Sequence, residues 1–485
     1  MTYLHGVQVN QKTSANVPMT QTRASVPVVI GCAPVFQVDG GNGGVVNVPV
    51  LCNTLNDFIT AFGWSTDYAH FSLCEAADVL FNLMNVGPAV FINALDPVVS
   101  GTQTTNQAES LVAGTYTLNV DNVVLNTLVV KDSAGTTTYT LTDDYTVVYD
   151  ANWHLVITRN PTGRIGATAA LKLSYKSVGS GVENAAMIEA GIAAVESVYA
   201  VTGMIPGQLV APFWSKVPEV ALALAAEAAN IDGAFTARAL VDISTNPSGV
   251  GALNITQALA WKTANAYTDP NMVVCWPLAK VGTVKYHLST FYAGARCLLN
   301  VANGVPDVPF ASASNQRIPI TSLCTFDGTA IYQTMTGTNT LEANGIVTAI
   351  NQPRGWVLWG NRSGGYPGST DPSLTFNAEQ EMFIFLKNAL LTSFWQNVDA
   401  PLNPRDVHGW LTTINQWLNS LVAPGYLVGA SCDFLAADNA VNDLADGRIV
   451  LDIQTGYTPP ARLIILNVTE NTDYLSALFN GNNGA

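Results

Sequence analysis

Residues that could perform acid–base or covalent chemistry are few and scattered in this sequence. The five histidines stand at positions 5, 70, 154, 287 and 408, and no pair has the His-x-x-x-His spacing that puts two zinc ligands on one helix face. Neither Gly-x-Ser-x-Gly nor Gly-x-x-x-x-Gly-Lys-Ser/Thr occurs, so no nucleophile elbow and no phosphate loop of that type is predicted. We therefore expect no catalytic, cofactor-binding or metal-binding residue, and no cofactor.

The acidic residues that could act in catalysis also have simpler interpretations. Asp242 closes an apolar run and could be a catalytic carboxylate, but capping of the next turn together with Ser244 and Asn246 is the favoured interpretation. The adjacent pair Asp143 and Asp144 lies between two alternating segments, where a turn is expected. A divergent α/β hydrolase stays an alternative without a nucleophile motif.

Composition predicts a chain that hides much of its surface. Hydrophobic residues make up 48% of the 485 residues and charged residues only 11%, against about 25% in an average globular protein. Extensive subunit contacts would explain this, since large apolar patches on a monomer tend to associate; a monomer with a large core is the other possibility. The net charge of −15 argues against a broad basic surface for nucleic acid.

Cysteine content and the absence of leader sequences set the expected compartment. The seven cysteines are odd in number and lack Cys-x-x-Cys spacing, which favours free, buried thiols in a reducing environment. The first residues show no basic, apolar leader, so we expect no signal peptide. No apolar run approaches the roughly 20 residues of a membrane helix, so membrane insertion is not expected.

Strand-like and helix-like segments alternate over 26–100 and again over 182–345, which predicts an α/β core. Thr54 and Asp57 form a capping-box pattern at the first helix. This alternation implies a mostly parallel sheet covered on both faces. Strands are expected at 26–31, 89–94, 208–211, 237–243 and 272–276, and helices at 54–62, 71–84, 183–201, 218–230, 255–267 and 287–301.

Two further units are expected. Residues 101–181 are rich in Thr, Val, Tyr and Gly, with short alternating segments separated by turn residues, which predicts an inserted β-sandwich. Residues 346–460 predict an α+β C-terminal domain. Its expected elements are strands at 355–360 and 448–454 and amphipathic helices at 378–395 and 406–421.

The two ends of the chain are expected to form extended arms over residues 1–25 and 461–485. Each contains an apolar segment of about strand length, at 3–9 and 462–468. A strand on a loose tether has little stability alone and becomes useful by adding to the sheet edge of another subunit. The residues expected to make these contacts are Tyr3, Leu4, Val7, Val9, Leu463, Ile464, Leu466 and Val468.

Several short motifs, in order along nearly the whole chain, resemble contractile bacteriophage tail sheath proteins. The chain opens with Tyr3-Leu4-His5-Gly6-Val7, similar to an aromatic-x-x-Gly-Val arm, and its first core strand ends in Gly31-Cys32-Ala33-Pro34. The segment 355–362 is similar to the family's Gly-x-x-x-Trp-Gly-x-Arg pattern. The segments 447–450 and 460–464 resemble its closing pair of strands.

This resemblance implies a mechanical subunit rather than an enzyme. It implies a subtilisin-like core without catalysis, hexameric rings stacked into a helical sheath around an inner tube, and contraction that drives the tube through the host envelope. Implied partners are copies of the same chain, the tail tube protein, and baseplate and tail terminator proteins, with no direct nucleic-acid contact. The implied location is the virion tail, assembled in the host cytoplasm.

The surface that would contact the tube is expected in the C-terminal domain. Candidates are Asp406 and Trp410 on the predicted helix 406–421 and Asp438 and Asp443 in an acidic stretch, although a solvated acidic face is also a sufficient explanation of that stretch. A sheath of a related bacteriocin or secretion system is the second interpretation. An adhesin with the β-sandwich as its binding end is a third, but it would need a secretion signal.

Overall fold

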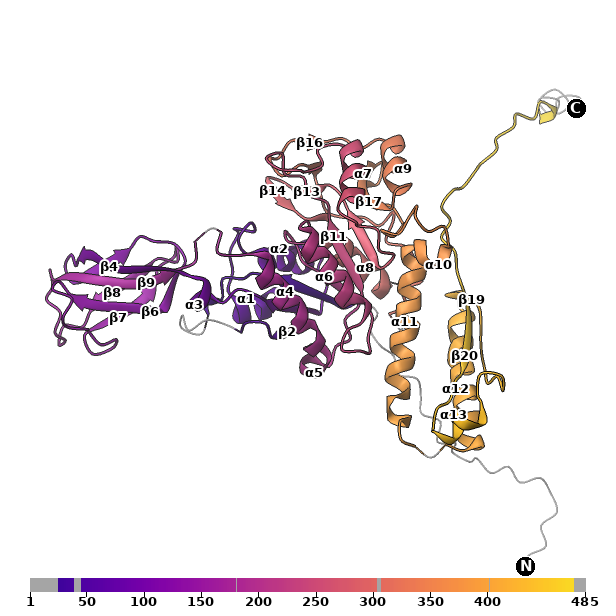
Figure 1. Ribbon diagram of the computed structural model, residues 1–485. Helices are drawn as coiled ribbons and strands as arrows, with labels where there is room; N and C mark the ends of the chain where they lie inside the picture. The colour runs from indigo at the N-terminus through magenta and orange to yellow at the C-terminus, as the bar shows by residue number, and fades with distance from the viewer. Residues whose placement is uncertain (1–24, 39–44, 180, 303–306, 401, 475–485) are drawn as a thin grey trace, which may run out of the picture.

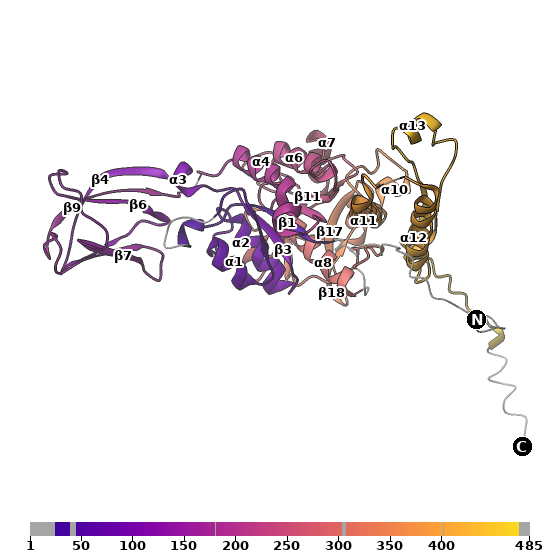
Figure 2. The same cartoon turned by 90° about the horizontal axis from the view of Figure 1, so that it is seen from below.

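The computed structural model describes residues 25–38, 45–179, 181–302, 307–400 and 402–474 (Figure 1). The arm residues Tyr3, Leu4, Val7 and Val9 lie outside these ranges. The described chain is elongated: a β unit extends from one side of a central α/β body, and a helical unit with a short hairpin lies at the other side (Figures 1 and 2).

The centre of the body is one eight-stranded sheet, which confirms the predicted mostly parallel architecture. The six inner strands run parallel, and the strands at both edges pair antiparallel with their neighbours. The order is β18 (Gly355–Trp359), β17 (Ile346–Gln352), β12 (Met272–Cys275), β11 (Arg238–Asp242), β10 (Gln208–Val210), β1 (Pro27–Gly31), β3 (Ala89–Asn93) and β2 (Pro49–Cys52).

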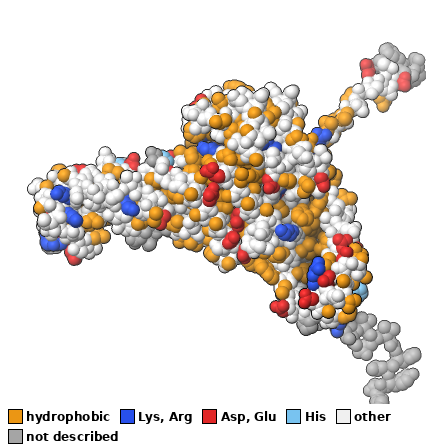
Figure 3. Space-filling view, viewed as in Figure 1, with side chains coloured by type: hydrophobic (Ala, Val, Ile, Leu, Met, Phe, Trp, Pro, Cys, Tyr) orange, Lys and Arg blue, Asp and Glu red, His pale blue; other side chains and the backbone are white. Residues whose placement is uncertain are grey.

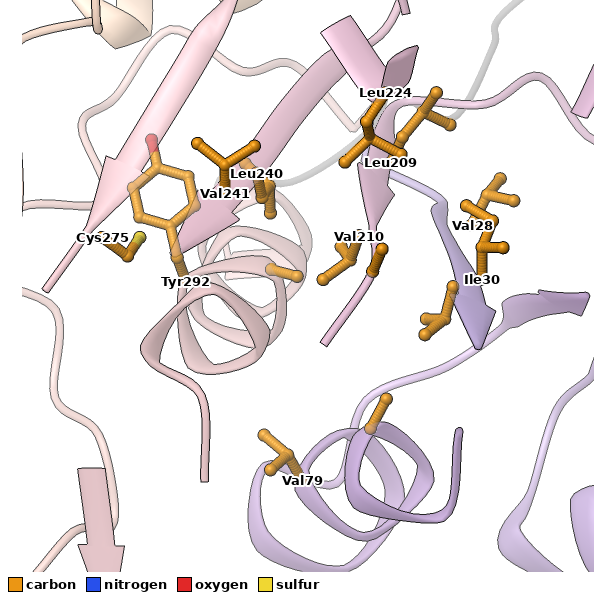
Figure 4. Packing of buried hydrophobic residues seen from close by; sticks show 14 of the residues in the cluster. Val28, Ile30, Val79, Leu209, Val210, Leu224, Leu240, Val241, Cys275 and Tyr292 are labelled. Atoms are coloured by element: carbon orange, nitrogen blue, oxygen red, sulfur yellow. The ribbon is translucent and has the colours of Figure 1, made fainter. Parts of the chain in front are cut away.

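The inner strands are mostly apolar because helices cover both sheet faces. Every residue of β1, β3, β10, β11 and β12 is buried. Figure 4 shows Leu224 of α6 (Pro218–Ala229) reaching the strands from one side, and Val79 and Tyr292 reaching them from the other. Val79 belongs to a π-helical segment (Asp78–Leu83) that continues α2 (Ser72–Ala77), and Tyr292 to α8 (Leu288–Ala302).

The other helices of the body follow the sequence pattern with local differences. The predicted capping box is confirmed, since Thr54 accepts from Asp57 N and Asp57 accepts from Thr54 N. The single helix expected at 183–201 is broken by a 3-10 turn, where Ser197 Oγ donates to Ala194 O. The segments are α1 (Leu55–Phe62), α4 (Ala185–Ala193), the turn Ala194–Ser197, α5 (Val198–Thr202), α7 (Ile255–Ala264), α9 (Met335–Glu342) and a 3-10 turn at Val35–Gln37.

From the sequence we expected no segment long and apolar enough to cross a membrane, but the helical run Ala185–Thr202 meets both criteria by length and composition alone. In the fold it packs against the sheet through Ile188, Ile192 and Val195.

A four-stranded antiparallel sheet also lies beside the body, formed in order by β14 (Val284–Tyr286), β13 (Leu278–Val281), β15 (Ser322–Cys324) and β16 (Ala330–Ile331).

Residues 102–177 form two three-stranded antiparallel sheets with a hydrophobic cluster of their own, which includes Leu155, Ile157 and Leu173. The short helix α3 (Pro97–Ser100) precedes them. One sheet holds β4 (Thr102–Ser110), β9 (Ala170–Ser177) and β6 (Val123–Asp132), and the other β5 (Thr115–Leu118), β8 (Leu155–Arg159) and β7 (Tyr145–Tyr149).

The C-terminal unit packs two long helices against a hairpin around a separate cluster that includes Phe385, Ile414, Leu418 and Cys432. The boundary expected at residue 346 falls inside the central sheet instead, because β17 pairs with β12 of the body. The elements are α10 (Pro372–Thr375), α11 (Asn377–Phe394), a 3-10 turn at Trp395–Asn397, α12 (Pro404–Val422), β19 (Leu427–Asp433), α13 (Val441–Ala445) and β20 (Asp452–Tyr457).

The bounds predicted for one strand near the C-terminus are wrong. The strand expected at 448–454 begins only at Asp452, because Asn439 Oδ1 and Nδ2 hold the N–H and C=O of Val450 at 2.8 and 2.9 Å. The segment 462–468 is extended but belongs to no strand, since no described residue pairs with its backbone. It leaves the body as a single ribbon (Figure 1).

A deletion tests whether the β unit is structurally separable. Thr102 and Ser177 are direct neighbours across β4 and β9, so a variant with residues 102–177 replaced by Gly-Gly keeps the chain path of the body. We expect a folded protein whose unfolding free energy in urea is lower by about 1.5–3 kcal/mol, chiefly because Val124 leaves the body's cluster.

Leu173→Ala in the full chain is the matched variant. It should destabilise the β unit by about 2–5 kcal/mol while the unfolding of the body stays unchanged. An insoluble deletion variant, or one shared unfolding transition that Leu173→Ala shifts as a whole, would show that the unit and the body fold as one.

Candidate assembly site

The carboxyl end of β11 carries a buried polar cluster that resembles a catalytic constellation in composition. Asp242 is 3% exposed and accepts hydrogen bonds from Ser215 Oγ at 3.1 Å and Ser289 Oγ at 2.5 Å. The Ser289 backbone N–H also donates to Asp242 at 3.1 Å. Both serine side chains are fully buried. Asp242 therefore caps the first turn of α8, where a carboxylate also interacts favourably with the helix dipole.

The histidine beside this cluster is oriented by a different acid. His287 Nδ1 lies 2.9 Å from Glu75 Oε2, and both residues are buried. The Ser289 hydroxyl donates to Asp242, so the relay of serine, histidine and acid that a nucleophilic serine needs is not formed. Capping at Asp242 was expected, but the prediction that it caps the next turn is wrong: it caps a helix 47 residues further along.

The remaining chemistry-bearing residues have structural partners as well. Asp144 accepts from Arg164, and this guanidinium holds the pKa of the Asp144 carboxyl well below its usual range. All seven cysteines are free and buried, as predicted, and burial raises the pKa of the Cys74 thiol to about 12. Within the described ranges, no three His, Cys, Asp or Glu residues are grouped to hold a metal ion.

The C-terminal ribbon is the most unusual surface of the described chain. Its side chains are 71% exposed at Leu463, 72% at Ile464, 83% at Leu466 and 95% at Val468. Figure 3 shows this ribbon as a line of hydrophobic side chains extending away from the body. Exposed aliphatic side chains in an extended backbone fit a segment that is covered only after association.

The hairpin β19–β20 is the sheet of the C-terminal unit. It has only two strands. They are stable here because α12 packs against one face of the hairpin, where Leu418 of α12 and Cys432 of β19 belong to the same hydrophobic cluster. The hydroxyl of Thr458 donates to Gly425 O at 2.8 Å just before the ribbon starts. The ribbon therefore begins at the hairpin but runs away from it (Figure 1).

The four residues considered for tube contact do not gather into one patch. Asp406 lies in the first turn of α12, where Asn403 Oδ1 accepts its N–H at 3.0 Å, and Trp410 packs edge-on against Phe394 at 6.1 Å. Asp438 lies before α13 and Asp443 lies within it, and this helix projects from the unit (Figure 2). Asp443 pairs with Arg448 at 3.3 Å.

Sequence reasoning missed the residues that join the C-terminal unit to the body. Glu381 of α11 is buried, pairs with Arg296 of α8 and accepts from Tyr292 at 3.0 Å. Arg238 of β11 donates to Asn377 at 2.7 Å. The sequence signal for these residues is that charged side chains stand at apolar positions of the predicted helices and strands. This signal does not identify their partners.

Comparison with known proteins shows which proteins this chain is similar to. No protein-family model matches the chain. It is 28% identical over 504 residues to the tail sheath protein of Burkholderia phage BcepMu, with 99% of each chain covered. It is 29% identical over 147 residues to the major tail sheath protein of Serratia phage KSP20, covering 30% of this chain and 36% of that protein.

Solved structures with the same fold come from contractile assemblies. The anti-feeding prophage, solved as a baseplate and as a contracted helical sheath, gives a TM-score of 0.58 at 14% identity, covering 97% of this chain and 100% of that one. The contracted sheath of the injection system PVC gives 0.57 at 14% identity, covering 98% and 99%. At these identities the likeness concerns the fold, which is mixed α/β with several sheets.

The pH dependence of stability tests the structural role of Asp242. Burial raises the pKa of this carboxyl above its unfolded value near 4, so the native state binds the proton more tightly. Its contribution is fully present below pH 4 and is lost as the pH rises toward the folded pKa. The difference in unfolding free energy between the wild type and Asp242→Asn should therefore decrease as the pH rises above 4, by at most about 1.4 kcal/mol per pH unit.

Chemical denaturation at pH 4 to 7 measures this difference. Ser289→Ala keeps the carboxyl, so it should keep the pH dependence while losing about 1–3 kcal/mol at every pH. Parallel curves for the wild type and Asp242→Asn would contradict the assignment.

Proposed function

We infer that this chain, which belongs to the contractile tail sheath proteins, is a structural subunit of a contractile phage tail sheath. The observation that carries this inference is the match to the BcepMu tail sheath protein over 99% of both chains. The structural likeness to contracted sheaths supports the same conclusion at the level of the fold. A mechanical role agrees with a polar cluster that caps a helix instead of activating a nucleophile.

We propose that the exposed ribbon 462–468 pairs with the hairpin of a neighbouring subunit. In an extended backbone Ile464, Leu466 and Val468 share one side, while Leu463, Ile465 and Asn467 share the other. Covering one large aliphatic side chain contributes about 1.5–3 kcal/mol, and each net backbone hydrogen bond about 0.5–1.5 kcal/mol. One ribbon is a modest link, but repeated links hold a lattice through multivalency.

The N-terminal arm is proposed to make a second link through Tyr3, Leu4, Val7 and Val9. Two such links would keep neighbours attached while the bodies change their mutual contacts during contraction. In this proposal the stored energy lies in body–body contacts that improve on contraction. No nucleotide is needed for such a transition.

The division of labour among the units is also a proposal. We propose that residues 26–100 and 182–345 form an inert, subtilisin-like core extended by β17 and β18, with 101–181 as an inserted domain facing outward. The C-terminal domain, expected over 346–460, would then start after Trp359 and face the tube. Asp438 is the best tube-facing candidate, because it is exposed while Asp406, Trp410 and Asp443 have intramolecular partners.

The proposed partners are copies of this chain, the tail tube protein, and the baseplate and tail terminator proteins. Assembly would occur in the host cytoplasm, and contraction would drive the tube through the host envelope. The likeness to the anti-feeding prophage and PVC favours one alternative, the sheath of a related injection particle such as a bacteriocin or secretion system. Electron microscopy of particles from a producing culture distinguishes them, since only a phage tail carries a head.

Point variants in the ribbon test strand donation. Leu466→Asp should abolish the hollow tubes seen by negative-stain microscopy, because it puts a charge on the side to be covered. The thermal unfolding midpoint of the subunit should stay unchanged, since Leu466 is 83% exposed.

Asn467→Asp adds the same charge on the opposite side of the ribbon and should still form tubes. Tubes of normal length from Leu466→Asp would exclude the ribbon as a required link.

Removal of residues 1–21 tests the second arm. We expect a folded, soluble subunit that no longer forms tubes, measured by sedimentation and negative-stain microscopy. Polymerisation of the truncated chain into ordinary tubes would count against arm exchange at this end.

A further inference from the structure

The hairpin has a defined hydrogen-bonding register, so the direction of each backbone group can be stated. Cys432 lies opposite Ile453, Ser431 opposite Gln454, and Ala430 opposite Thr455. In an antiparallel pair, opposite residues alternate between those that exchange both hydrogen bonds and those that exchange none. Groups that make no bond within the pair point outward, toward a possible third strand.

One asparagine occupies the outward groups of β19. Asn415 Oδ1 accepts from Cys432 N at 2.9 Å, and Asn415 Nδ2 donates to Cys432 O at 2.8 Å. The same amide donates to Leu411 O at 3.0 Å within α12, which fixes its orientation. This side chain therefore mimics a neighbouring strand at Cys432, the next-to-last residue of β19.

The opposite edge is left open in the described part of the chain. Because Cys432 bonds to Asn415, its pair with Ile453 exchanges no hydrogen bonds, and the N–H and C=O of Ile453 point outward from β20. Thr455 has the same direction by alternation. Among the described residues, none forms a hydrogen bond to the backbone of Ile453 or Thr455. Unpaired backbone groups at a strand edge form a template for another strand.

We propose that Asn415 is a positioning residue for assembly: it occupies the outward backbone groups of Cys432 on β19, so that the C-terminal ribbon of a second copy adds to β20 instead. This inference rests on the proposed ribbon exchange and specifies its edge. A third strand on β20 also continues the apolar inner face, where Ile453 and Tyr457 pack beside Cys432. Ile464, Leu466 and Val468 would extend this face toward α12.

The occupant follows from length and chemistry. The ribbon spans seven residues and β20 six, so the ribbon can pair along the whole strand. In this structure the ribbon runs away from its own hairpin, which leaves β20 free for the ribbon of another copy (Figure 1).

Disulfide crosslinking between matched positions tests the edge. Ser431 and Gln454 are direct partners on the outer face of the hairpin, so a ribbon on β20 lies one strand from Gln454 and two strands from Ser431. Neighbouring strands are about 4.8 Å apart, and a disulfide needs Cα atoms within about 7 Å. Gln454→Cys and Ser431→Cys are each combined with Leu463→Cys, Ile465→Cys or Asn467→Cys on the same side of the ribbon.

Oxidised tubes are separated on a non-reducing gel. We expect covalent chains of subunits with Gln454→Cys and only monomers with Ser431→Cys. Covalent chains with Ser431→Cys instead would overturn the edge assignment while supporting ribbon exchange. Tubes without a crosslink at either position would overturn both, because the ribbon would then bind elsewhere.

Substitution of Asn415 separates positioning from stability. Asn415→Ala opens the edge of β19, so crosslinks with Ser431→Cys should appear beside those with Gln454→Cys. Asn419→Ala on the exposed side of the same helix is the control and should leave the crosslinks at Gln454→Cys alone. An Asn415→Ala protein that forms tubes with crosslinks only at Gln454→Cys would show that Asn415 does not select the edge.

Discussion

The pairing of backbone N–H and C=O groups at sheet edges is the constraint on which this structure depends. In the central sheet, Asn315 N and Ile318 N donate to the outer edge of β18. In the hairpin β19–β20, the amide of Asn415 bonds to the outward groups of Cys432, while no described residue bonds to the outward groups of Ile453 and Thr455. The open edge of β20 is the place where, in our proposal, another chain adds a strand.

Sequence patterns predicted the parts of the fold in which side-chain chemistry repeats locally. The parallel sheet was predictable because strands such as β1 and β12 are uninterrupted apolar runs, and α1 because Thr54 and Asp57 cap it. Strand β4 gave no such signal, since its sequence is polar and its residues are exposed or half-buried. The ribbon 462–468 has strand-like residues but no partner among the described residues, a combination that the proposed pairing with another chain explains.

Contacts between distant segments were not predictable in the same way. The cap provided by Asp242 depends on α8 arriving beside β11, and the ion pair of Arg296 with Glu381 depends on α11 docking there. Both require the tertiary arrangement. The proposed role of Asn415 had an even weaker signal, because an asparagine on an amphipathic helix usually faces water; only its two bonds to Cys432 distinguish it.

The β unit leaves and re-enters the body through two chains that lie side by side at Thr102 and Ser177. Beside this neck, Tyr149 Oη donates to Val123 O at 2.7 Å and lies 3.3 Å from Phe36 O of the body, and Val124 packs in the hydrophobic cluster of the body. A single tether would let the unit swivel, whereas a doubled neck with a lateral brace resists torsion. Torque applied to the far end of this unit is therefore passed through α3 into β3, which lies beside the edge strand β2 of the central sheet.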